Sequence, residues 1–349
     1  MAASALRRRA AWLAPAGAAA CLVALVAAAL LPPAAWRAWL GAAFLWASTP
    51  IGALALLMIM RLSPGDWSEE LGPFMEAQTL LLPLSALLML PVLIEIRRIY
   101  PWPHAPQPTA FRAAWLAEPA FIARTIVWYL MLAALAGLLV LRGGRSTVTA
   151  CVGLILLPTF GTFIATDWLL SLDPDFASSG FGLYVLEIQM LTAFALTLAA
   201  LAVSGREVRR PGILGALLLC LLLFWSYLAF MHFIITWSDN LPPGVRWYQR
   251  RGGGWGLVMW AVAASRLIPT FLLLFQTVRR SPRALLALCG LVVLGSVLEA
   301  AWLTLPAAGT GPAGPAEIVL FVFASLGMAA LVGGGFLRAF AWRTARRPA

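Results

Sequence analysis

The stretch GILGALLLCLLLFWSYLAFMHFIITW, residues 212–237, decides the fold class, because it is almost wholly apolar and contains no Asp, Glu, Lys or Arg. A bilayer core about 30 Å thick is crossed by roughly 20 apolar residues in a helix. The stretch is long enough to do so, and it is therefore typical of a transmembrane helix.

Nine further stretches of the same kind flank it, with Pro, Gly and Arg in the gaps between them. The chain therefore predicts an all-α polytopic protein, one integral membrane domain over residues 1–349. The ten expected spans lie at about 12–31, 38–60, 77–99, 119–141, 147–170, 181–203, 212–237, 254–277, 284–305 and 316–340.

The composition of the 349 residues excludes the soluble classes. Hydrophobic residues make up 62% and charged residues 11%, against roughly 45–50% and about 25% in an ordinary soluble domain. The formal net charge is +11, and all 25 residues counted as Lys or Arg are arginine. Because these arginines stand in short groups between apolar stretches and form no basic stripe, we expect the lipid bilayer as partner and no nucleic acid.

The arginines also predict the orientation. With a cytoplasmic N-terminus, sixteen arginines fall on the cytoplasmic side, two lie inside helices, and the outer side holds Arg37, Arg97, Arg98, Arg112, Arg246, Arg250 and Arg251. Cytoplasmic loops carry the excess of basic residues, so both termini are expected inside. The arginines at 7–9 before the first apolar run also suit a signal peptide, but that run is long, which favours a retained helix.

Metal ligands are scarce in this chain. The four cysteines lie in apolar segments without a C-x-x-C pair, which is not the spacing of an iron–sulfur or zinc site; they are Cys21, Cys151, Cys220 and Cys289. A haem held by two histidines would need both His104 and His232, and His104 stands in the Pro-rich PWPHAPQP. We expect no metal site and no intrinsic cofactor; if the protein takes part in electron transfer, the metal centres belong to a partner.

Arg266 is predicted near the middle of the span at 254–277. A charge there costs about 2.5–3.5 kcal/mol on insertion scales, and arginine stays protonated. It therefore needs a partner: Glu299 on the next span is one candidate, and Asp167 and Glu187 are others. A structural ion pair and a functional role both remain open.

His232 and the acids near it are expected toward the outer membrane face. His232 has two interpretations: a buried neutral histidine bonded to a hydroxyl, or a quinone ligand or proton relay. Asp167, Glu187 and Asp173 come from neighbouring span ends, where Asp173 could also cap the segment after it. Their convergence predicts a polar, water-accessible pocket.

Two motifs carry a family resemblance: TDWLLSLDPDFASSGFGLYVL (166–186) and FWSYLAFMHFIITWSDNLPPGVRWYQRRGGGWG (224–256), supported by RLIPTFLLLFQTVRRSPRALLAL (266–288). The chain resembles the ActF-like membrane subunit of alternative complex III, a quinol:cytochrome c oxidoreductase, within the NrfD-like (polysulfide reductase membrane subunit) superfamily. The resemblance covers about 75–306. Residues 1–70 match only as apolar helices, and 307–349 hold the last helix and an Arg-rich tail.

The resemblance implies two four-helix bundles with two peripheral spans, in a complex of the bacterial cytoplasmic (inner) membrane whose iron–sulfur and haem c groups sit on other subunits. It also implies a quinone or quinol site, or a proton path, near the periplasmic side. The candidate residues are Asp167, Asp173, Glu187, His232 and Asp239, with Arg266 and Glu299 as an organising ion pair.

The chain departs from the family pattern at several positions. Position 232 is usually Gln there, Asp239 replaces a Gly, and the paired glutamates after N-L-P are Pro243 and Gly244 here. Arg266 stands where His is common, and Glu299 where Asp is common. The missing glutamates put an acidic proton-exit role of that loop in doubt.

Two other functions remain open, and so does the question whether the chain takes part in catalysis. The chain is also compatible with a non-redox structural subunit whose buried charges only hold helices together. A secondary transporter is the other alternative: prolines interrupt several spans, but no convincing internal repeat is visible in the sequence.

Overall fold

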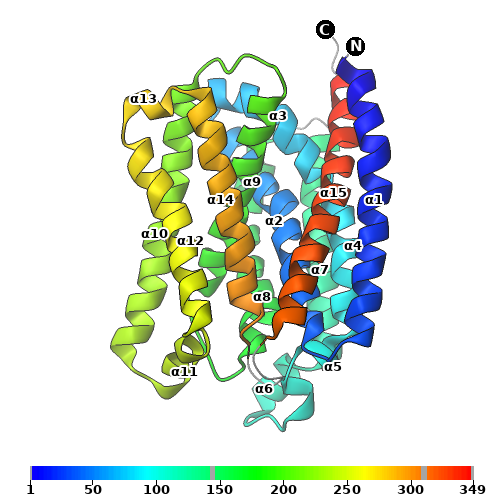
Figure 1. Ribbon diagram of the computed structural model, residues 1–349, viewed down its shortest axis with the longest axis vertical. Coiled ribbons are helices and arrows are strands. Elements are labelled where there is room, and N and C mark those ends of the chain that lie inside the picture. Colours follow the sequence, from blue (N-terminus) through cyan, green and yellow to red (C-terminus); the bar gives the residue numbers. More distant parts are fainter. Residues whose placement is uncertain (1, 142–145, 308–312, 347–349) are drawn as a thin grey trace.

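The computed structural model describes residues 2–141, 146–307 and 313–346, and every regular element among them is helical. Ten of the described helices are long and apolar enough to cross a membrane, which confirms the all-α polytopic fold. Both termini lie at the same end of the molecule (Figure 1), here called the terminal end. The other end is called the distal end.

The spans agree closely with the sequence prediction. They are α1 (Ala2–Leu30), α2 (Ala35–Leu62), α3 (Asp66–Thr79) with α4 (Leu82–Ile94), α7 (Glu118–Ala136), α8 (Thr147–Trp168), α9 (Phe181–Val203), α10 (Pro211–Asp239), α12 (Gly254–Leu273), α14 (Pro282–Thr304) and α15 (Pro315–Arg346). Short helices connect them: α5 (Ile96–Ile99), α6 (Ala110–Trp115), α11 (Pro242–Arg250) and α13 (Gln276–Arg279). Single turns lie at Trp102–His104, Gly137–Leu141 and Leu170–Leu172.

The predicted start of the third span is wrong: it begins at Asp66 rather than near 77. The Ser68 hydroxyl accepts a hydrogen bond from the Gly65 backbone N–H at 3.1 Å, and acidic residues in the first turn suit the helix dipole. The span is interrupted between α3 and α4, just before Pro83. Proline has no N–H to donate to the carbonyl four residues earlier, and its ring clashes with that carbonyl.

Eight of the spans form two four-helix bundles. The N-terminal bundle is α2, α3–α4, α7 and α8, and the C-terminal bundle is α9, α10, α12 and α14; in each bundle every helix packs against the next and the last packs against the first. The bundles meet chiefly where α2 packs on α9. Helices α1 and α15 pair with one another and flank α2, so the expected two-bundle arrangement with two peripheral spans is confirmed.

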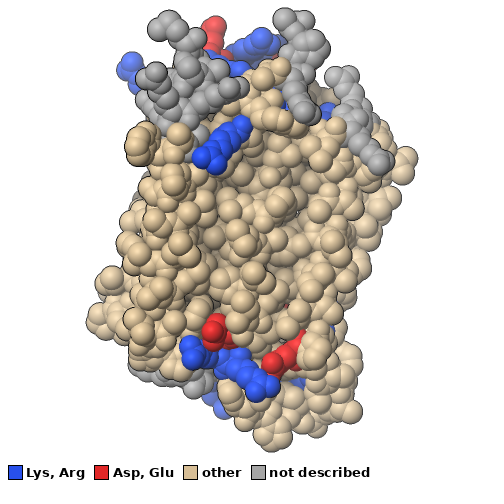
Figure 2. Space-filling model, turned by 90° about the vertical axis from the view of Figure 1, so that its right-hand side faces the viewer, with Lys and Arg blue, Asp and Glu red and all other residues tan. Residues whose placement is uncertain are grey.

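The outer surface of the bundles suits a lipid environment. Figure 2 shows a broad band without charged side chains between charged groups at the two ends. Large apolar side chains of the spans, such as Leu130, Ile155 and Phe271, are more than half exposed. Cys151 and Cys220 also lie on the surface, although they stand in apolar segments, whereas Cys21 and Cys289 are buried.

Small residues let α1 approach α15 closely. A Cβ atom at Gly17 would overlap the backbone of Leu331 and Gly327, and one at Gly334 would lie 2.7 Å from the Ala14 backbone nitrogen. Small residues at such crossings allow the backbones of membrane helices to pack directly.

Gly17→Leu is therefore expected to release α1 from α15, at a cost of about 1–3 kcal/mol for the forced repacking. Because α1 packs almost only on α15, the two bundles should stay folded. Hydrogen–deuterium exchange of residues 11–30 measures the release. Ala19→Leu, which adds the same side chain at an exposed position of α1, is the control. Equal exchange in both variants would contradict the prediction.

Candidate functional site

Arg266 is fully buried in the C-terminal bundle and is held by three groups of α14. Its Nη2 lies 3.0 Å from Glu299 Oε2 and 2.9 Å from Ser296 Oγ, and its Nη1 donates to the Val292 carbonyl at 2.7 Å. Neither charged side chain is exposed. The structure thus brings Arg266 to Glu299, the first of the partners considered from the sequence.

The second carboxylate oxygen of Glu299 accepts from two aromatic side chains. The Trp225 indole N–H donates to Oε1 at 2.9 Å, and the Tyr184 hydroxyl donates to the same atom. Both oxygens of the carboxylate are therefore hydrogen-bonded. A buried charge is tolerated only when it is paired and bonded in this way.

Asp167 belongs to a different ion pair, in the N-terminal bundle. Its carboxylate binds Arg124 in a fork, with Nε to Oδ2 at 2.6 Å and Nη2 to Oδ1 at 3.0 Å. The Arg124 guanidinium also lies over the Trp115 ring, 4.2 Å from its centroid. Asp167 is therefore not available to Arg266.

The two ion pairs reveal a repeat that the sequence does not show. In each bundle the arginine stands on the third helix and the acid near the end of the fourth: Arg124 and Asp167 on α7 and α8, Arg266 and Glu299 on α12 and α14. Each bundle also has a cavity between its second and third helices. The arrangement of the helices thus shows a repeat of the two bundles that is not visible in the sequence.

The cavity of the C-terminal bundle, between α10 and α12, has a volume of about 480 Å³. Its walls are mainly aromatic and aliphatic, from Tyr184, Trp225, Ser226, Ala229, Phe230, His232, Phe233, Trp247, Tyr248, Met259, Trp260, Val262, Ala263, Leu267 and Trp302. Phe230 and Trp260 are more than half exposed on the apolar surface. The cavity therefore opens toward the lipid, and we call it the aromatic cavity.

His232 lies in the wall of the aromatic cavity with one ring nitrogen bonded. Its Nδ1 is 3.1 Å from the Tyr248 hydroxyl oxygen, and its Nε2 is buried without a hydrogen-bond partner among the described residues. Burial raises the pKa of Tyr248 above its ordinary value of 10.0, so the phenol stays neutral at neutral pH. When Tyr248 donates to Nδ1, Nε2 carries a proton and is a donor; in the other tautomer Nε2 is an acceptor.

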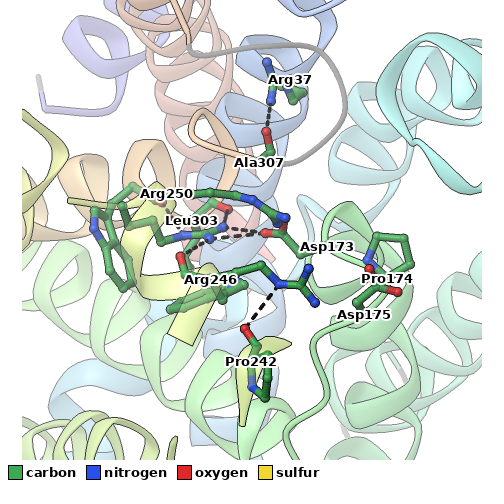
Figure 3. A network of polar contacts seen from close by, with 12 residues as sticks. Arg37, Asp173, Pro174, Asp175, Pro242, Arg246, Arg250, Leu303 and Ala307 are labelled. Carbon is green, nitrogen blue, oxygen red and sulfur yellow. Dashed lines mark hydrogen bonds and ion pairs between the residues drawn. The ribbon is translucent and has the colours of Figure 1, made fainter. Parts of the chain in front are cut away.

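Helix α11 closes the distal side of the cavity and is held by an ionic network (Figure 3). Asp173 binds Arg250 and the buried Arg251, whose Nη2 lies 3.1 Å from Oδ2. Arg251 also donates to the Leu303 carbonyl at 3.1 Å. Burial lowers the pKa of Arg251 to about 10 and Asp173 opposes that shift, so Arg251 is charged at neutral pH.

The predicted acid-lined pocket is wrong in character. No carboxylate is among the described residues that line the aromatic cavity; Asp167, Asp173 and Glu299 are each bound by an arginine outside that lining. Asp239 is exposed at the end of α10. Glu187 is fully buried on α9, and neither of its carboxylate oxygens has a hydrogen-bond partner among the described residues.

Sequence reasoning missed the aromatic residues that shape the cavity. The Tyr184 and Trp247 rings lie 5.9 and 5.6 Å from the His232 ring, and Tyr248 bonds it. The signal was present in the motifs 166–186 and 224–256, which hold these three aromatics beside the acids, but tryptophan and tyrosine at span ends are commonly interface anchors.

Within the described part of the chain, no three His, Cys, Asp or Glu side chains are grouped so as to hold a metal ion. No model of a known protein family matches this chain, and no curated protein matches it either.

Proposed function

We propose that this chain is the membrane subunit of a quinol:electron-acceptor oxidoreductase of the alternative complex III type, and that the aromatic cavity binds the head group of a quinol or quinone. The observation that carries the proposal is His232 in the wall of a cavity that opens to lipid, with a buried Nε2 that has no hydrogen-bond partner among the described residues. In the predicted orientation, the cavity lies toward the periplasmic side of a bacterial inner membrane.

The size and lining of the cavity support a lipid-borne ring. Ligand sites commonly enclose about 300–1,000 Å³, with apolar walls and a few placed polar groups. The aromatic cavity falls in that range, and its open side lets an isoprenoid tail remain among the lipids. No charged side chain is among the described lining residues, which suits a neutral ligand.

The polar groups match the protons of the reaction. Oxidation of a quinol to a quinone releases two protons and two electrons. His232 Nε2 accepts from a quinol hydroxyl in one tautomer and donates to a quinone carbonyl in the other. Behind the cavity wall, the Tyr184 hydroxyl donates a hydrogen bond to Glu299. The buried Glu187 lies on α9, the same helix as Tyr184. The electrons pass to iron–sulfur and haem c subunits in this proposal.

His232→Leu is expected to weaken binding of decylubiquinone to the purified protein about 5- to 150-fold in Kd, because a buried site loses one hydrogen bond, worth about 1–3 kcal/mol. His232→Gln should keep most of the affinity, since an amide can both donate and accept. Quenching of tryptophan fluorescence by the quinone reports binding, because Trp225, Trp247, Trp260 and Trp302 line the cavity.

A steric pair of variants locates the ligand. Ala263→Phe fills the aromatic cavity and should abolish quenching, whereas Ala261→Phe, at an exposed position of the same helix, should not. His104→Leu is the matched histidine control, because His104 lies outside the cavity and is exposed. Undiminished binding in both Ala263→Phe and His232→Leu would overturn the proposal.

A further inference from the structure

A second crevice lies on the other side of the molecule, where α9 and α15 flank α2 and α3. Its volume is about 220 Å³, and it shares no residue with the aromatic cavity. Leu196, Ala329, Gly333 and Phe336 in its walls are partly exposed, so the crevice is open to the lipid. We call it the polar-floored crevice.

Three of the residues that line the crevice each carry a buried polar atom without a hydrogen-bond partner among the described residues: Trp46 Nε1, Thr49 Oγ1 and Gln78 Oε1. Thr49 and Gln78 are only 2% and 3% exposed. Most buried polar groups in proteins are hydrogen-bonded, and each that is not needs an explanation. Three in one crevice indicate a missing occupant with polar atoms of its own.

The crevice also adjoins the interruption between α3 and α4. Gln78 stands in the last turn of α3, and Leu81, in the interruption, is another lining residue. Irregular backbone at membrane depth is tolerated where it is buried in protein or lines a polar cavity. The break therefore places a polar floor within the apolar part of the molecule.

The lining restricts the class of occupant. The Trp46 indole can only donate, so the occupant must carry an acceptor oxygen. No charged side chain is among the described lining residues, which disfavours an anionic head group. Thr49 lies close to the middle of α2 (Ala35–Leu62), deeper than the head groups and ester carbonyls of phospholipids reach.

We infer that the polar-floored crevice binds a neutral, lipid-soluble molecule that carries a carbonyl or hydroxyl oxygen on an apolar ring or chain. Its oxygen accepts from Trp46 and Thr49, a hydroxyl donates to Gln78, and its apolar body lies against Leu196, Val332 and Phe336. This site does not depend on the proposed function of the aromatic cavity.

Gly333 offers a way to close the crevice without disturbing the helices. A Cβ at this position would meet no atom within 4 Å. The side chain added by Gly333→Leu therefore enters the crevice and does not disturb the packing between helices. Gly290→Leu is the matched control, because Gly290 also faces open space and lies outside the crevice. Thr49→Val removes one polar atom, and Thr197→Val is its control: its hydroxyl is likewise buried and without a partner among the described residues, but does not line the crevice.

The experiment is native mass spectrometry of the purified full chain, combined with photolabelling by an azido-quinone and by a diazirine-bearing geranylgeraniol. We expect a neutral lipid on the wild-type protein and labelling of peptides that contain residues 46–49 or 78. Gly333→Leu should remove both signals, and Thr49→Val should lower occupancy about five-fold, as the loss of about 1 kcal/mol implies. Both control variants should behave as wild type.

The two photoprobes distinguish a quinone ring from an isoprenoid alcohol as the source of the oxygen. Labelling that persists in Gly333→Leu, or a wild-type protein with neither bound lipid nor label at these residues, would overturn the inference. Ala263→Phe, which closes only the aromatic cavity, should leave the labelling intact. The experiment therefore tests the polar-floored crevice separately from the proposed quinone site in the aromatic cavity.

Discussion

Arg266→Met is expected to destabilise the protein by about 3–5 kcal/mol, the cost of breaking a buried ion pair by removing one partner. Glu299 would keep its bonds from Tyr184 and Trp225 but lose its counter-ion in a fully buried position. The measurement is the free energy of unfolding in mixed micelles of a mild detergent and sodium dodecyl sulfate.

The double variant Arg266→Met/Glu299→Gln should recover most of that loss. The glutamine side-chain oxygen can still accept from Tyr184 and Trp225, and no buried charge remains. Arg97→Met is the control: its pair with Glu118 is largely exposed, and such pairs contribute only about 0–1 kcal/mol. The single variant Glu299→Gln completes the comparison. If the double variant loses as much unfolding free energy as Arg266→Met and Glu299→Gln lose together, the two residues are not coupled and the prediction is wrong.

Gly52→Leu is expected to prevent the two bundles from assembling. At this position α2 crosses α9 so closely that a Cβ atom would overlap the backbone carbonyl group of Gln189. A backbone atom of a packed helix cannot move aside as a side-chain end can, so the cost exceeds the usual 1–3 kcal/mol or so of overpacking. The expected result is a large loss of folded, monodisperse protein in size-exclusion chromatography.

Gly256→Leu is the comparison for that variant, because a Cβ at Gly256 meets no atom within 4 Å. Gly52→Ala should already lower the unfolding temperature, since the clash begins at the Cβ atom. A Gly52→Leu protein that elutes and unfolds like wild type would contradict the close approach of α2 and α9.

The spans could be predicted because hydropathy is local. A helix must place roughly 20 apolar residues in the bilayer core, and each such run is read from neighbouring residues. The prediction failed at the start of the third span because Glu69, Glu70 and Glu76 lowered its apolar character, although the helix continues through them. There Glu76 lies between Arg61 on the preceding span and Arg343, which is far away in the sequence.

The choice of partners could not be predicted in the same way. The sequence indicated that Arg266 needs an acid and named Glu299 first, but it kept Asp167 and Glu187 as further candidates. In the structure Glu299 pairs with Arg266 and Asp167 pairs with Arg124. The carboxylate of Glu187 has no hydrogen bond among the described residues. The cavity is therefore lined by aromatic and aliphatic side chains and not by the acids that the sequence had suggested.

What the sequence determined by itself is the number of spans and their approximate limits, because these follow from the length of the apolar runs. Only the tertiary structure decided which buried groups meet. Most spans are apolar on all sides, as in α10, so the sequence does not show which face turns toward a neighbour. Close helix packing sets that rotation, and with it the aromatic walls around His232 and the polar floor beside Gln78.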